Sequence, residues 1–136
     1  MRIDTRSSDS DDFARLTGRY VLVVDDDAHD ANVLAAVLEH CGAHVRTATS
    51  LDAATRWLSH VTPDVLVIGL SAPEPLSDPL VEAVRALGAR APAVALHPRD
   101  AASVRTAALA AGFHECLSKP VDVRALSRVI GRLARA

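Results

Sequence analysis

Short apolar runs alternate along the chain with longer segments whose apolar residues recur every three or four positions. The runs at 20–24, 65–68 and 93–96 consist of valine, leucine, isoleucine and alanine with a single tyrosine. They are too short for helices, so they predict strands that are buried on both faces of a sheet. Residues 44–48 are less apolar and predict an edge strand, and residues 115–117 predict a short fifth strand.

A helix is predicted after each of these strands. In the first, from Asn32 to Cys41, apolar residues recur at helical spacing, and Gly42 supplies the stop. The later helices are marked by a residue that caps the first turn or by a glycine after the last. They run from Ser50 to Leu58, from Asp78 and Pro79 to Leu87, from Asp100 to Gly112, and onward from Asp122.

Five strand–helix units in succession predict an α/β domain with one parallel sheet, right-handed crossovers and helices on both faces. The expected strand order is 2-1-3-4-5, that of flavodoxin-like (βα)5 folds. The chain of 136 residues has the size of one domain, which we place at residues 19–136. Residues 1–18 are rich in aspartate, serine and arginine and are expected to form a flexible tail. They contain no apolar stretch that resembles a signal peptide or a membrane span.

The composition narrows the classes of function. A net charge of −2 gives no reason to expect a nucleic acid partner. The two cysteines, Cys41 and Cys116, lie far apart and are expected to be free thiols in a reducing cytoplasm. His40, Cys41 and His44 lack a fourth ligand for zinc. No phosphate-binding loop, dinucleotide fingerprint or nucleophile elbow is present. We therefore expect a cytoplasmic protein that is not an enzyme and needs no cofactor.

Polar and small residues stand where four predicted strands end. Asp25 and Asp26 follow the first strand, Gly69 ends the third, His97 ends the fourth, and Lys119 follows the fifth. The carboxyl ends of parallel strands meet at one edge of the sheet, where such folds bind ligands. Lys119 is the only lysine of the chain, since every other basic residue is an arginine or a histidine. We expect these positions to form one site.

This order and spacing resemble the receiver domain of bacterial two-component response regulators. The resemblance implies that the position of Gly69 would carry the aspartate that accepts phosphate from a histidine kinase. It implies that Asp25 and Asp26 hold Mg²⁺ together with that aspartate and the backbone carbonyl of Ser71. Lys119 would contact the phosphoryl oxygens. His97 stands where the family has a threonine or serine, and Cys116 where it has a switch aromatic.

Three of these functional positions are altered. Glycine has no side chain, so Gly69 cannot form an acyl phosphate. The metal site loses a ligand, and we expect Mg²⁺ binding to be weak or absent. His97 lacks the sensing hydroxyl, and Cys116 cannot replace the switch aromatic. We therefore expect a pseudo-receiver that acts by protein–protein contact with a histidine kinase, a response regulator or another signalling protein, or as a homodimer, with Lys119 paired to Asp25 or Asp26.

Other interpretations stay open at this point. Phosphate could be accepted at Asp25 or Asp26, or the vacated pocket could serve a small-ligand or enzyme domain with His97 as base. His97 could equally pair with the two aspartates or lie in a solvent-facing loop. Without the resemblance, acidic residues after a strand would simply complement the next helix dipole, as Asp27 is expected to do. Arginines recur every four residues on the last helix, either as a solvated face or as an interaction surface: Arg124, Arg128 and Arg132.

Overall fold

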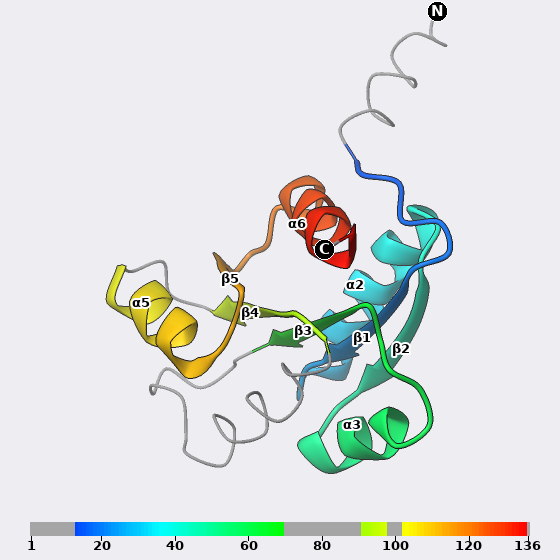
Figure 1. Ribbon diagram of the computed structural model, residues 1–136, viewed down its shortest axis with the longest axis horizontal. Helices are drawn as coiled ribbons and strands as arrows, with labels where there is room; N and C mark the ends of the chain where they lie inside the picture. The colour runs from blue at the N-terminus through cyan, green and yellow to red at the C-terminus, as the bar shows by residue number, and fades with distance from the viewer. Residues whose placement is uncertain (1–12, 70–90, 98–101, 136) are drawn as a thin grey trace, which may run out of the picture.

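A five-stranded parallel sheet forms the centre of the molecule (Figure 1). The computed structural model describes residues 13–69, 91–97 and 102–135. The order of strands is β2-β1-β3-β4-β5, which confirms the predicted flavodoxin-like topology and the edge position of β2. The elements are β1 (Tyr20–Val24), α2 (Ala28–His40), β2 (His44–Ala48), α3 (Leu51–Leu58), β3 (Val65–Gly69), β4 (Ala93–His97), α5 (Ala102–Ala111), β5 (Glu115–Ser118) and α6 (Val123–Arg135).

Most element boundaries agree with the sequence pattern. The exception is α2, which begins at Ala28 rather than Asn32 because the Asp27 carboxylate caps it by accepting a hydrogen bond from the Asp30 N–H at 3.1 Å. The first turn has no apolar periodicity, so the pattern alone could not locate it. The predicted helix from Asp78 to Leu87 and the cap at Asp100 lie outside the described residues.

Two apolar layers hold the helices on the sheet. Successive strand residues point to opposite faces, and both faces of the central strands are buried. One layer packs against α2 and α6, and the other packs against α3 and α5 (Figure 1). Valine, leucine and alanine fill both layers, as expected for a sheet covered on its two sides. No helix in the described part of the chain is long and apolar enough to cross a bilayer.

The segment 13–18 belongs to the folded body. Leu16 is 0% exposed and packs in the layer of α2 and α6, and its backbone N–H donates to the Cys41 carbonyl at 2.8 Å. The expectation of a flexible tail over 1–18 is therefore wrong for 13–18. A single buried leucine in a polar stretch leaves no periodic signal, which is why the sequence did not reveal this contact.

Candidate functional site

The carboxyl edge of the sheet brings the predicted positions together. Gly69 lies beside Leu96 in the register of β3 and β4, and His97 lies beside Ser118 in that of β4 and β5. The Lys119 N–H donates to the His97 carbonyl at 2.7 Å. Four of the five positions thus converge from β1, β3, β4 and β5 as the parallel topology requires.

Asp25 is the centre of this cluster. It is 1% exposed. Its Oδ2 accepts a hydrogen bond from the Lys119 ammonium at 3.0 Å, and its Oδ1 accepts one from the Asp27 N–H at 2.9 Å. Its own N–H donates to the Ala48 carbonyl at 3.0 Å, which fixes the backbone where β1 ends. Both carboxylate oxygens are therefore engaged inside the protein.

The Asp25 carboxylate also fills the space in front of Gly69. A β-carbon added to Gly69 would lie 2.6 Å from Asp25 Cγ and 3.2 Å from Asp25 Cβ, and it would overlap Oδ2. Real β-carbons do not approach other atoms this closely, so any side chain at residue 69 requires Asp25 to move. Gly69 and the inward position of Asp25 are thus one structural feature. No local pattern signals this feature, because the two residues lie 44 positions apart in the chain.

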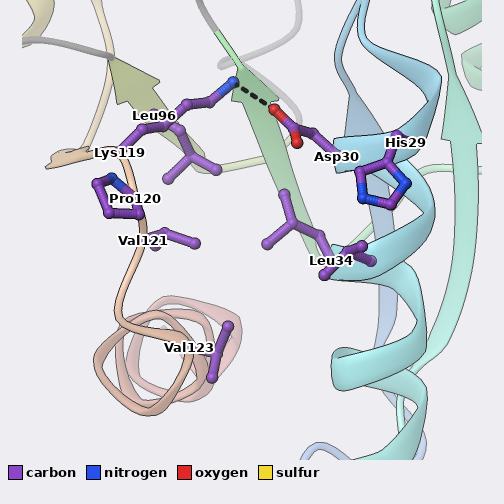
Figure 2. A pocket seen from close by; sticks show the side chains of 9 residues that line it. His29, Asp30, Leu34, Leu96, Lys119, Pro120, Val121 and Val123 are labelled. Atoms are coloured by element: carbon purple, nitrogen blue, oxygen red, sulfur yellow. Dashed lines mark hydrogen bonds and ion pairs between the residues drawn. The ribbon is translucent and has the colours of Figure 1, made fainter.

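Lys119 has a second carboxylate partner. Its ammonium also binds Asp30 Oδ2 at 3.4 Å, and the side chain is 19% exposed (Figure 2). Burial opposes the charge of Lys119, but the hydrogen bonds and negative charges of Asp25 and Asp30 outweigh it and raise the pKa of the ammonium. Asp30 was missed in the sequence because it lies in the first turn of α2, which the apolar pattern did not reach.

The remaining predicted residues lie around this pair. His97 is 2% exposed at the end of β4, so the interpretation of a solvent-facing loop histidine is wrong. Cys116 is buried in the apolar layer of α3 and α5, and neither it nor Cys41 forms a disulfide bond. Asp26 follows Asp25 with an exposed side chain.

The described residues do not fit a magnesium ion. A hard divalent cation needs several oxygen ligands with open coordination sites. Asp25 is buried with its two oxygens held by Lys119 and Asp27, Gly69 offers no side chain, and Asp26 supplies one carboxylate. Within the described ranges no group of three or more histidines, cysteines or acidic residues is placed to hold a metal, and this includes His40, Cys41 and His44.

A groove of about 510 Å³ opens beside Lys119 (Figure 2). It lies between α2 and the segment that joins β5 to α6, which contains the cis peptide bond between Lys119 and Pro120. Its walls are mostly apolar, with Asp30 and Lys119 paired across the rim. Leu34 faces it from α2, Leu96 faces it from β4, and Val121 and Val123 face it from the α6 side.

The arginines of α6 are partly engaged within the protein. The Arg124 guanidinium lies 5.4 Å from the centre of the Phe13 ring, and Arg132 forms an ion pair with Glu115 at 3.0 Å. Arg128 is exposed between them. The predicted stripe exists on the helix surface, and Arg124 and Arg132 tie α6 to neighbouring segments.

Comparison with known proteins identifies the family. The profile of the response regulator receiver domain matches residues 21–131. The chain belongs to this family. As a receiver domain, it is 38% identical over 112 residues to an uncharacterized 14.6 kDa protein in the sodA1 3′ region of Leptolyngbya boryana, covering 81% of this chain and 86% of that protein. It is 26% identical over 117 residues to the DNA-binding transcriptional regulator NtrC of Rhizobium meliloti, covering 86% of this chain but 24% of NtrC.

Solved receiver domains share the fold. The receiver domain of the Francisella response regulator 1452 superimposes with a TM-score of 0.76 at 24% identity, covering 87% of this chain and 98% of that one. A response regulator receiver domain protein from Clostridium thermocellum gives a TM-score of 0.72 at 22% identity, covering 86% and 94%. At these identities the likeness shows the fold alone. The family assignment therefore places the chain in two-component signalling, and the site geometry bears on how this member works.

Proposed function

We propose that this receiver domain functions as a pseudo-receiver, which acts through contacts with other signalling proteins and is not phosphorylated on an aspartate. The observation that carries the proposal is the Asp25 carboxylate, which fills the space in front of Gly69 and binds Lys119 at 3.0 Å. A receiver that accepts phosphate needs a reactive carboxylate and a lysine ready to meet the phosphoryl group. Here the residue at the acceptor position has no side chain, and the lysine ammonium is already paired with the carboxylates of Asp25 and Asp30.

Phosphorylation of the acidic pair is less well supported by this arrangement. To attack a phosphoryl donor, Asp25 would have to expose an oxygen from a 1% exposed site and give up the hydrogen bond from Lys119. Asp26 is exposed, but Lys119 contacts Asp25 and Asp30 instead. For Lys119 to meet an acyl phosphate at Asp26, it would have to leave these two carboxylates.

The enzyme alternative is also less well supported. A general base must come within hydrogen-bonding reach of the proton that it removes from a substrate. His97 is 2% exposed, so a substrate could reach its imidazole only if β4 or its cover moved. The groove beside Lys119 is mainly apolar, and its two charged groups already pair with each other.

Intact-mass analysis tests the proposal directly. The full chain is incubated with acetyl phosphate and Mg²⁺, beside a receiver that has its acceptor aspartate as a positive control. We expect no phosphoryl adduct on this chain while the control is modified. A stoichiometric adduct would overturn the proposal, and the variants Asp25→Asn and Asp26→Asn would then show which carboxylate accepts the group.

For the contact surface we propose the exposed side of α6. Receiver domains interact with histidine kinases and other signalling proteins, and Arg124, Arg128 and Arg132 place three guanidinium groups along this helix. Arg124→Glu with Arg128→Glu should weaken self-association or partner binding, and the effect should shrink with salt, because exposed charges are screened within about 10 Å at 0.1 M. The loss of the Phe13 contact should cost about 0.5–1 kcal/mol of stability.

Sedimentation velocity over a range of protein and salt concentrations measures self-association, and titration with a candidate kinase or regulator measures partner binding. If the double variant associates and binds as the parent does at every salt concentration, α6 is not the contact surface.

A further inference from the structure

The outer edge of β2 is a second surface that the site at Asp25 does not involve. The His44 N–H donates to the Arg19 carbonyl at 2.8 Å, and the Ala48 carbonyl accepts from the Asp25 N–H at 3.0 Å, so the backbone groups of His44 and Ala48 face β1. Because strand residues alternate, the N–H and C=O groups of Val45 and Thr47 face away from the sheet. Among the described residues no strand pairs with this edge.

A hollow of about 520 Å³ surrounds this edge. It runs from Glu39 at the end of α2, across His44 and Arg46, to Trp57 on α3 and Val61 beyond it. Trp57 is the only tryptophan of the chain, and Val61 is 49% exposed. A second hollow of about 320 Å³ lies on α3 and includes Trp57, Arg56 and His60. The outward backbone groups of β2 therefore lie beside the partly exposed Trp57 and the exposed Val61.

The charge of this surface is opposite in sign to that of the whole protein. The Arg46 guanidinium stacks over the Trp57 ring at 5.2 Å from its centre, and Arg56 lines the second hollow. The two hollows hold two guanidinium groups and two imidazoles against the single carboxylate of Glu39. In the described ranges none of these four basic side chains forms an ion pair, although the chain carries a net charge of −2.

We propose that the β2 edge binds an extended acidic segment of a partner protein. The segment adds a strand to the sheet by hydrogen bonds to the outward groups of Val45 and Thr47. Its carboxylates lie near His44 and Arg46, and an apolar side chain rests against Trp57 and Val61. The two hydrogen-bonding residues align the segment with the strand edge, and the charges select its composition.

The charges also argue against two other occupants. A second copy paired edge to edge through β2 would bring His44 and Arg46 of both chains together, and like charges across a strand pair are destabilising. A single-stranded nucleic acid would use the arginines and stack on Trp57, but it has no backbone groups to match Val45 and Thr47. Single-stranded nucleic acids are usually bound by several aromatic side chains that stack on successive bases, and this surface has one tryptophan.

This surface lies at the amino end of the sheet, among residues that begin β1 and β2, whereas Asp25 lies at the carboxyl end. The inference is therefore independent of whether the domain is phosphorylated.

The single tryptophan makes the test direct, because the fluorescence of Trp57 reports on its own surface. The full chain is titrated with a short synthetic peptide of alternating glutamate and valine. Three comparison probes are used: the same peptide with lysine for glutamate, the same peptide with alternate N-methylated amides, and a single-stranded oligonucleotide. We expect saturable binding of the acidic peptide alone, with amide exchange slowed at Val45 and Thr47.

Charge reversal on the protein locates the site. Arg46→Glu with Arg56→Glu should weaken binding of the acidic peptide by about tenfold or more. Arg15→Glu with Arg105→Glu makes the same change of charge away from the β2 edge, on two exposed residues, and should leave binding unchanged. Circular dichroism and thermal midpoints check that both variants fold.

Several results would overturn the proposal. These are no binding of the acidic peptide at about 1 mM, equal binding of the N-methylated peptide, equal loss in both charge-reversed variants, or oligonucleotide binding at Trp57 in place of peptide binding.

Discussion

Replacing Gly69 by alanine tests whether Asp25 occupies the acceptor position. Glycine inside a strand usually weakens it, and a change to alanine where the backbone allows it stabilises a protein by about 0.4–1 kcal/mol. The backbone of Gly69 is not in the left-handed region, so it allows alanine. The new methyl group would nevertheless lie 2.6 Å from Asp25 Cγ, and the carboxylate would have to leave. We therefore expect the opposite sign.

The magnitude follows from two costs. Forcing an extra methyl group into a packed interior costs about 1–3 kcal/mol. Separating Asp25 from Lys119 leaves a buried charge without its partner, which costs about 3–5 kcal/mol at fully buried sites. That second cost is reduced here because Lys119 is 19% exposed and keeps Asp30 at 3.4 Å. Because Asp25 can rotate and so relieve part of each cost, we expect the free energy of unfolding to fall by about 2–4 kcal/mol.

Urea denaturation followed by Trp57 fluorescence measures this loss. The matched control is Asp25→Ala, which empties the space in front of Gly69. In that background Gly69→Ala should be neutral or stabilising, so the two changes should show a coupling free energy of about 2 kcal/mol or more. If Gly69→Ala stabilises the parent protein, or if its effect is the same in both backgrounds, then Asp25 does not fill this space.

Three further predictions concern the same pair and the start of the domain. Gly69→Asp without metal should lower stability. Mg²⁺ at about ten times its Kd should return about 1.4 kcal/mol of stability to this variant but not to the parent. Equal Mg²⁺ responses of the two proteins in thermal denaturation would show that the carboxylates do not converge. Because the pKa of Lys119 is raised, its charged ammonium stabilises the fold. This contribution to the free energy of unfolding should be complete below pH ~10.4 and fall as pH rises further. The stability gap between the parent and Lys119→Gln should narrow above that pH, and a constant gap in denaturation curves would contradict the pairing. Leu16→Ala should cost about 2–5 kcal/mol by urea denaturation, whereas a leucine in a flexible tail would cost almost nothing.

The sequence revealed the fold because the information is local and repeated. Three apolar runs of four or five residues and two shorter or less apolar segments marked the strands, and glycines marked helix ends. Gly42 and Gly112 indeed take positive φ angles of 104° and 117°. The strand order followed from the chirality and layering of strand–helix units, without any knowledge of individual contacts. Polar segments carry no such repetition, so the first turn of α2 and the packing of Leu16 escaped detection.

The arrangement of the candidate site was predictable only in part. Parallel topology brings the ends of strands together, so the proximity of Asp25, Gly69, His97 and Lys119 could be expected. The choice of Lys119 between Asp25 and Asp26 could not, because it depends on the side-chain rotamer of Asp25 and on the Asp27 N–H that holds it. The competition for space between Gly69 and Asp25 depends on side-chain packing between residues 44 positions apart, which no residue pattern encodes.

The buried pair also bears on what could regulate this domain. A signal shifts a protein between two states only if it interacts differently with each of them. In a phosphorylated receiver the phosphoryl group supplies that difference, since it comes and goes while the lysine stays. In this chain the negative group that binds Lys119 is the Asp25 carboxylate. This carboxylate is held by the Asp27 N–H and, as part of the protein, is present at all times. Under the proposed function, phosphate therefore cannot set the state of the domain. Control has to come from whatever binds its surfaces, and for this reason α6 and the β2 edge are the places where a regulatory input is to be sought.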